Sequence, residues 1–335
     1  MSLADAVLGV MFLGVTAYAL FGGADFGAGV WDLFAGGTRR GADQRRLIER
    51  SLGPVWEANH VWLIFVLVVL WTAFPLGFAS IASTLYVPLT LAGFGMIARG
   101  SAFAFRHSVP GLPLQRALGA AFAFSSVVTP FFLGTIAGAV ASGRVPPGIA
   151  AGNVVTSWLN PVSILGGILA VGTCAYLAAV FLCGDAERAG EPVLAAQFRL
   201  RAIAAALVTG VIALAGIAVL ASGAPRLFDG LTGRGLPAVA VSAAAGIASI
   251  ALLVRRRFGY ARIAAALAVA AILWGWALAQ YPYLLTPSLT IAEAAAARAT
   301  LTALLGSLLV GAAILVPSLW FLYRLFQRSP ARDHS

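Results

Sequence analysis

Long apolar stretches separated by short polar segments dominate this chain. About nine of them approach the ~20 residues that a helix needs to cross the hydrocarbon core of a bilayer. Their interiors carry very few charged residues. The pattern predicts about nine membrane helices, near residues 5–34, 56–75, 78–104, 116–141, 160–183, 200–222, 236–254, 261–281 and 298–324.

Local signals mark several boundaries. Phe74–Gly77 predicts a tight turn between the antiparallel second and third spans. Asn160–Pro161 predicts an N-cap followed by proline at the first helical position, where its missing N–H costs nothing. Thr290–Glu293 has the spacing of a capping box on the approach to the last span. Residues 39–52 predict a short amphipathic helix on the membrane face.

The composition supports one membrane body over residues 1–335 rather than several soluble domains. The chain is 61% hydrophobic and 10% charged, whereas soluble domains are about 25% charged. The net charge of +10 comes from arginine without lysine. We do not expect nucleic-acid binding, because the arginines lie mainly between apolar stretches and form no basic domain.

The arginines predict the orientation of the helices. If the N-terminus lies outside, eighteen arginines fall in inside segments and only four outside, namely Arg144, Arg226, Arg234 and Arg298. Positive residues accumulate on the cytoplasmic side of membrane proteins. The expected topology therefore has a periplasmic N-terminus, an odd number of spans and a cytoplasmic C-terminus.

The two cysteines and the N-terminus add little chemistry. Cys174 and Cys183 lie in one apolar stretch, nine residues apart and out of phase on a helix, so we expect packing residues and no disulfide. The N-terminus lacks the basic segment and the cleavage site of a signal peptide. We expect the first apolar stretch to remain as a helix.

Ionisable residues inside the spans are the strongest functional candidates, because burying charge in a membrane is expensive. Asp25 lies in the inner half of the first span, Glu57 at the inner start of the second, and Arg99 toward the inner end of the third. The topology brings all three to a similar depth. With Asn59 and His60 they predict one buried polar cluster suited to proton uptake.

A static ion pair that holds the first three spans together fits the same residues, since buried pairs occur without any transport role. Asp5 and Asp32 lie near helix ends, and we expect both to be solvated.

Haem binding by this chain is not expected. Haem iron takes axial His, Met or Cys ligands; His334 lies in the tail, His107 at a helix end, and His60 has no evident facing histidine. No cysteine–histidine metal cluster and no phosphate-binding loop occur. Trp56, beside Glu57, is a candidate for a cofactor or quinone surface, although most of the tryptophans fit an interfacial belt.

Four motifs resemble the second subunit of cytochrome bd quinol oxidases. Gly22–Gly27 (GGADFG) resembles the first-helix signature of that family, and Pro54–Ile64 (PVWEANHVWLI) its second-helix signature. Ser157–Pro161 (SWLNP) and Gly275–Tyr283 (GWALAQYPY) resemble later motifs. The match runs in order over nearly the whole chain, and the closing motifs are similar to the cyanide-insensitive branch.

The resemblance implies an all-α subunit with nine membrane helices in the bacterial inner membrane. It implies a larger partner, subunit I, which carries haems b558, b595 and d and the quinol site. The complex oxidises quinol and reduces O₂ to water with cytoplasmic protons. The acids matching Asp25 and Glu57 would line a proton path; some members carry Asp at the position of Glu57. A small accessory single-helix subunit is a further implied partner.

Two other hypotheses remain open. A proton-coupled secondary transporter would also explain the spans and the buried acids, but it predicts discontinuous helices, an inverted repeat and a site at the midplane. A purely structural subunit that shelters a haem-bearing partner differs from the oxidase hypothesis only in whether Asp25 and Glu57 move protons.

Overall fold

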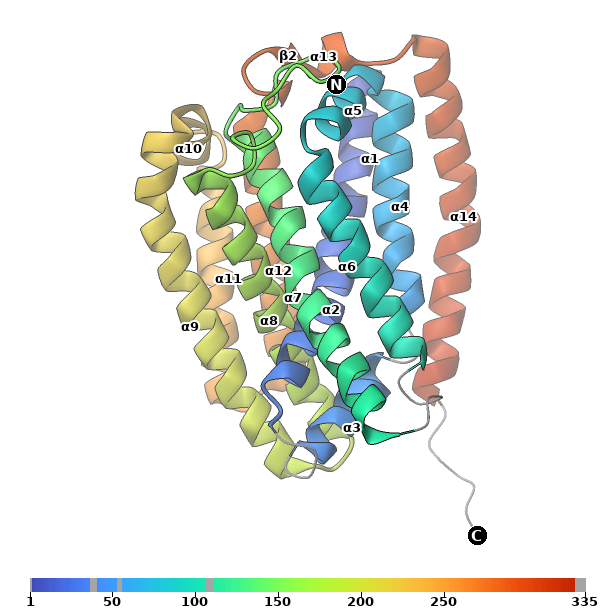
Figure 1. The fold of residues 1–335 in the computed structure, drawn as a ribbon, viewed down its shortest axis with the longest axis vertical. Coiled ribbons are helices and arrows are strands. Elements are labelled where there is room, and N and C mark those ends of the chain that lie inside the picture. The colour runs from blue at the N-terminus through green and yellow to red at the C-terminus, as the bar shows by residue number, and fades with distance from the viewer. Residues whose placement is uncertain (1, 37–40, 53–55, 106–110, 329–335) are drawn as a thin grey trace.

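The computed structural model describes residues 2–36, 41–52, 56–105 and 111–328, and it is almost entirely helical. Within these residues, eight helices are long and apolar enough to cross a membrane, and a bent pair of shorter helices raises the number to nine. The long helices run roughly parallel to one axis of the bundle (Figure 1). The predicted all-α membrane architecture is confirmed.

The first span consists of three consecutive pieces, α1 (Leu3–Ala17), the π-helix η1 (Tyr18–Gly22) and α2 (Gly23–Leu33). Ser2 and Asp5 form a capping box at its start, so Asp5 is a cap rather than a merely solvated residue. The π-helix directly precedes the stretch that contains Asp25. Single π-helical turns occur often at functional sites.

The predicted amphipathic helix is confirmed as α3 (Ala42–Leu52), which lies across the end of the bundle opposite the N-terminus (Figure 1). We call this end the α3 end. The buried side chains of Leu47 and Ile48 anchor α3 to the bundle.

The boundary between the second and third spans differs from the prediction. Helix α4 (Trp56–Ala73) stops before Phe74, and α5 (Pro75–Thr84) leaves it at 119° as a separate helix. The third span is α6 (Tyr86–Phe105), so it begins later than the expected span 78–104, and the turn at Phe74 leads into α5 rather than directly into the third span. Pro75 cannot donate the hydrogen bond that would continue α4, and apolar sequence alone does not distinguish a crossing helix from one lying across the bundle.

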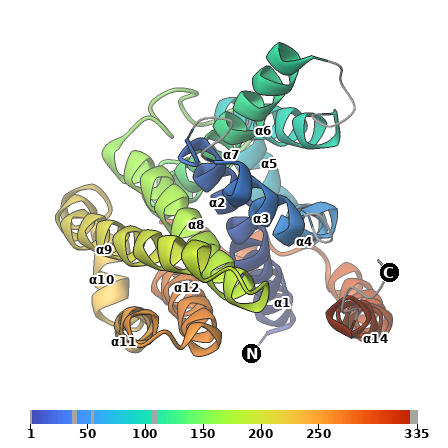
Figure 2. The same ribbon diagram turned by 90° about the horizontal axis from the view of Figure 1, so that it is seen from below.

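Six further spans complete the bundle. They are α7 (Leu112–Ala141), α8 (Pro161–Arg188), α9 (Pro192–Gly223), α11 (Leu236–Val254), α12 (Phe258–Gln280) and α14 (Arg298–Arg328). Seen along the bundle, α14 lies at one edge (Figure 2), where it packs against α1 and α4.

Short elements close the end that carries the N-terminus. They are α10 (Pro225–Thr232), the antiparallel strands β1 (Tyr283–Leu285) and β2 (Leu289–Thr290), and α13 (Ile291–Ala294). The predicted capping box of Thr290 and Glu293 is confirmed and opens α13. The predicted cap Asn160 accepts a hydrogen bond from the Ser163 amide, with Pro161 at the first position of α8.

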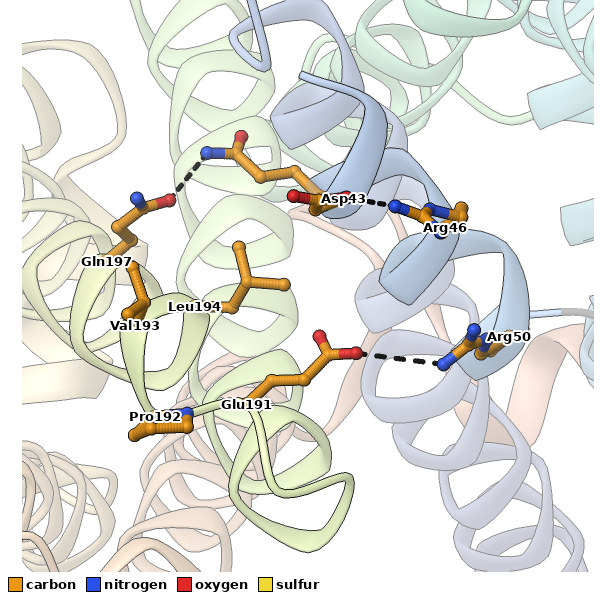
Figure 3. A pocket seen from close by; sticks show the side chains of 9 residues that line it. Asp43, Arg46, Arg50, Glu191, Pro192, Val193, Leu194 and Gln197 are labelled. Atoms are coloured by element: carbon orange, nitrogen blue, oxygen red, sulfur yellow. Dashed lines mark hydrogen bonds and ion pairs between the residues drawn. The ribbon is translucent and has the colours of Figure 1, made fainter. Parts of the chain in front are cut away.

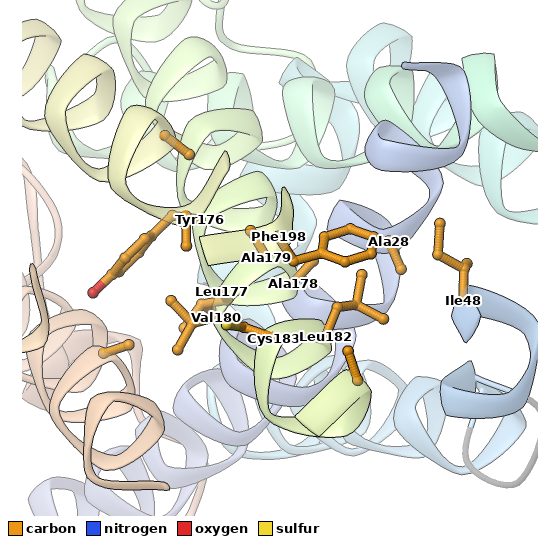
Figure 4. Packing of buried hydrophobic residues seen from close by; sticks show 14 of the residues in the cluster. Ala28, Ile48, Tyr176, Leu177, Ala178, Ala179, Val180, Leu182, Cys183 and Phe198 are labelled. Atoms are coloured by element: carbon orange, nitrogen blue, oxygen red, sulfur yellow. The ribbon is translucent and has the colours of Figure 1, made fainter. Parts of the chain in front are cut away.

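The main buried cluster surrounds α8, which runs through the middle of the bundle (Figure 2). Leu177 and Leu182 of α8 pack with Phe198 of α9, and Ile48 of α3 closes the same cluster (Figure 4). Both cysteines are free and buried in α8, as expected.

Close approach of α2 to α8 depends on one glycine. A Cβ atom at Gly27 would overlap the backbone carbonyl of Cys174. This contact fixes the rotation of α2, and therefore the direction in which its two aspartates face.

Candidate functional site

An ion pair between the first and third spans forms the centre of the site. Arg99 of α6 donates from Nη1 to one carboxylate oxygen of Asp25 at 3.0 Å and from Nη2 to the other at 2.8 Å. Nη2 also donates to the backbone carbonyl of Asp25 at 3.1 Å. Each residue is only 1% exposed. The predicted meeting of these two side chains is confirmed.

Helix α7 completes the environment of Arg99. The Nε atom donates to the hydroxyl of Ser126 at 3.0 Å, and Ser126 in turn donates to the carbonyl of Phe122. The guanidinium carbon lies 4.9 Å from the Phe122 ring centre and 5.0 Å from that of Phe26. Arg99 is thus held by a carboxylate, a hydroxyl and two aromatic faces. These contacts fix the position of its guanidinium, which is sealed from bulk water.

Ser126 and Phe122 were missed by the sequence analysis. A serine inside an apolar helix usually bonds to its own backbone, so it is a weak signal. Gly29, four residues after Asp25, was the available clue: a Cβ atom there would overlap the Ser126 hydroxyl. A glycine on the helix face that carries a buried acid indicates that another helix approaches it closely.

Asn59 and His60 lie near the pair but do not bond to it in the described contacts. Asn59 Nδ2 donates to the carbonyl of Phe21 at 3.4 Å, and its side chain is buried. The His60 ring lies edge-on to Phe26, with 5.9 Å between ring centres, and 6.3 Å from the ring of Tyr18. The Nδ1 atom of His60 is buried, without a hydrogen-bond partner in the protein.

Glu57 and Trp56 begin α4, but their side chains lie outside the described residues. The predicted roles of Glu57 in proton transfer and of Trp56 at a cofactor surface therefore stay predictions. Both residues begin α4 at the α3 end, and Asn59 and His60 follow within about one turn.

The expectation for Asp32 was wrong. Its side chain is only 5% exposed, and Arg45 of α3 donates from Nε to its carboxylate at 2.9 Å. A helix-end position predicted solvation, but α3 folds back and covers the end of α2.

No group of three or more His, Cys, Asp or Glu side chains could hold a metal ion within the part of the chain that the structure describes. His107 and His334 lie outside that part. The described site thus consists of a buried carboxylate, a guanidinium and nearby neutral polar groups, an arrangement that can hold or transfer a proton.

The comparisons agree on one family. A family model described as "Cytochrome bd terminal oxidase subunit II" matches residues 3–326. The chain is 31% identical over 171 residues to "Cytochrome bd ubiquinol oxidase subunit 2" of Bacillus subtilis, covering 50% of this chain and 48% of that protein. It is 30% identical over 222 residues to "Cytochrome bd-I ubiquinol oxidase subunit 2" of Escherichia coli K12, covering 64% and 55%.

The matched segments thus span about half the length of these two curated relatives. A solved structure extends the likeness to nearly the whole fold. A chain of the bd oxidase from Geobacillus thermodenitrificans is similar with a TM-score of 0.78 and 28% identity, over 97% of this chain and 99% of that one.

Proposed function

The chain belongs to the cytochrome bd terminal oxidase subunit II family, and on this premise we propose that it is the second subunit of a respiratory quinol oxidase in the bacterial inner membrane. Its partner would be a haem-bearing subunit I, and a small accessory single-helix subunit is a further expected partner. Haems b558, b595 and d in subunit I would supply the electron transfer and O₂ reduction. This chain would stabilise that subunit and conduct protons toward it from the cytoplasm.

The orientation rests on the distribution of arginine. Helix α3, the start of α9 and the link from α11 to α12 lie at the α3 end, and together they carry eight of the 22 arginines. Arg144, Arg226, Arg234 and Arg298 belong to the opposite end. The positive-inside rule then makes the α3 end cytoplasmic, with the N-terminus in the periplasm and the C-terminus in the cytoplasm.

The observation that carries the proton path is the buried Asp25–Arg99 pair. Asp25 is the third residue of α2. It lies nearer to the α3 end of the first span than to the periplasmic start of that span. Apolar packing of similar volume would hold two helices at least as well as a buried ion pair. A carboxylate retained at this depth is therefore better explained by proton transfer, with Glu57 as a second acid and Asn59 and His60 as supporting groups.

The geometry favours the oxidase over a secondary transporter. A transporter site is expected near the midplane, between broken helices. The described break between α4 and α5 lies at Phe74, close to the end that carries the N-terminus, whereas α2, which contains Asp25, lies toward the α3 end (Figure 1).

The test uses the intact complex. We expect Asp25→Asn and Glu57→Gln to slow quinol oxidation while haem content and assembly are retained. Asp229→Asn on α10, at the opposite end, is the control and should not change turnover. Wild-type turnover in both acid variants would leave only the scaffold hypothesis.

A double variant separates a relay from a static pair. Asp25→Asn alone leaves the buried Arg99 without its carboxylate, which destabilises the protein whatever the function. Asp25→Asn/Arg99→Gln removes both charges. A static pair predicts that the double variant recovers turnover, whereas a proton path predicts that it stays slow.

A further inference from the structure

A second buried acid lies on α2, nearer the α3 end than Asp25. Asp32 follows Asp25 by seven residues, close to two full turns, so the two residues lie on nearly the same helix face, about 10 Å apart along the axis. Gly29, between them on this face, packs against Ser126. The opposite face carries Gly27 and Trp31, and the Trp31 indole donates to the Ala175 carbonyl of α8 at 2.8 Å.

The two acids have different environments. The Asp25 carboxylate and its partner Arg99 are both sealed from water. Asp32 is also buried, but the side chain of its partner Arg45 is 26% exposed. Arg45 also donates from Nη2 to the carbonyl of Gly36 at 2.6 Å. The outer pair therefore lies at the boundary between the protein and water.

This difference determines the free-energy cost of protonating each carboxylate. When Asp32 takes a proton, its negative charge is lost, but Arg45 keeps its hydrogen bond to the Gly36 carbonyl and its contact with water. The guanidinium then remains solvated, so the neutral acid is accessible. Arg99 has no such contact with water, since its neighbours are Asp25, Ser126 and two phenyl rings.

Helix α3 is fixed in place beside the outer pair. Gln44, next to Arg45, donates from Nε2 to Gln197 of α9 at 2.7 Å, and Arg50 lies 3.7 Å from Glu191. A pocket of about 400 Å³ separates α3 from α9 between these two contacts (Figure 3). Polar side chains of both helices line this pocket, and the two contacts hold α3, which carries Arg45, beside the end of α2.

We propose that Asp32 is the outer proton-accepting group of the Asp25 route, with Arg45 as the positioning residue that holds its carboxylate at the water boundary. This inference rests on the proposed function. Hydronium gives its proton to the Asp32 carboxylate, an O–H bond forms, and the contact to Arg45 breaks. The Asp32 O–H bond then breaks as a hydrogen-bonded chain of water accepts the proton and delivers it to the Asp25 carboxylate, where a new O–H bond forms, and the Asp32–Arg45 pair re-forms.

The competing explanation is a structural pair that ties α3 to α2. Removing one partner of a buried pair is destabilising, but removing both is often neutral. The two explanations therefore give opposite results for the double variant Asp32→Asn/Arg45→Gln, which removes both charges of this pair.

The experiment compares Asp32→Asn, Asp32→Glu and the double variant in the intact complex. Turnover with excess quinol and proton uptake from the α3 side are measured, with haem content as the check of assembly. We expect Asp32→Asn and the double variant to slow both rates about tenfold, less than the loss of a group that protonates the reacting atom itself. Asp32→Glu, which keeps the acid, should recover most of the rate.

Asp43→Asn is the matched control. Asp43 lies on α3 and, like Asp32, is paired with an arginine of that helix, Arg46, but its side chain is 69% exposed. We expect wild-type turnover from this variant. Equal rates in Asp32→Asn and Asp43→Asn, or recovery of the wild-type rate in the double variant, would overturn the inference.

The test also separates this inference from the proposed function. If Asp25→Asn slows turnover and Asp32→Asn does not, only the role of Asp32 fails. If neither slows it, the proton path itself fails. Should Asp32→Asn not assemble, the double variant, which removes both charges of the pair, decides the outcome.

Discussion

The guanidinium of Arg99 faces the carboxylate of Asp25 with two nitrogens, at 3.0 and 2.8 Å, across the interface between the third and first spans. Both side chains are sealed from water. Charge-assisted bidentate contacts are among the strongest hydrogen bonds in proteins. This pair therefore fixes α2 against α6 and places a carboxylate deep in the bundle.

Breaking this pair from the arginine side should destabilise the subunit. Arg99→Gln leaves Asp25 buried without its counter-charge, and losses of this kind cost about 3–5 kcal/mol. We expect a lower unfolding midpoint of the purified complex, measured by thermal unfolding in detergent. An unchanged midpoint would mean that Asp25 finds another partner or water.

The Ser126 hydroxyl should contribute to the stability of the subunit through its hydrogen bond with Arg99. Ser126→Ala removes the hydroxyl that accepts from Nε, and a hydrogen bond to a charged group contributes about 1.5–3 kcal/mol. We expect a drop of that size in the free energy of unfolding. Ser125→Ala is the neighbouring control, because the Ser125 hydroxyl donates to carbonyls of its own helix; its effect should be clearly smaller.

Gly27 should not tolerate a side chain. The Cβ atom of alanine would overlap the Cys174 carbonyl, so α2 would have to move away from α8. We expect Gly27→Ala to reduce the yield of assembled complex in membranes. Gly9→Ala, where a Cβ atom meets nothing within 4 Å, should assemble normally. Equal yields would show that the helices separate at little cost.

Some of these contacts could be predicted from the sequence, and others could not. Most of the spans, the Asn160 cap and the Thr290 capping box depend on local periodicity and turn chemistry, and these were predicted. The meeting of Asp25 with Arg99 was also predictable, because the topology brings both to one depth. The 119° bend at Pro75, the Ser126 contact and the burial of Asp32 depend on which helices become neighbours, and no local pattern encodes that.

The capping box of α13 predicts a pH dependence outside the spans. Hydrogen bonds from the backbone N–H and hydroxyl of Thr290 lower the pKa of Glu293 below its ordinary value. A carboxyl whose pKa is lower in the folded state than in the unfolded state stabilises the folded state at pH values above its ordinary pKa. This stabilisation is lost as the pH falls through the lowered pKa.

The backbone amides of Ile291–Ala294 should therefore lose protection from hydrogen exchange as the pH falls below the pKa of an ordinary glutamate. The exchange rates are corrected for their intrinsic dependence on pH. Thr290→Val, which lacks the hydroxyl, should show weaker protection already at neutral pH. Protection that is independent of both pH and the hydroxyl would contradict this explanation.

The most direct test of the proton path is the rate of proton uptake by the complex in vesicles. A pH-sensitive dye on the α3 side follows uptake after an oxygen pulse to the reduced complex, and haem absorbance follows electron transfer in the same sample. We expect Asp25→Asn to slow proton uptake about tenfold or more, with haem content unchanged. Proton uptake at the wild-type rate in this variant would contradict the path through Asp25.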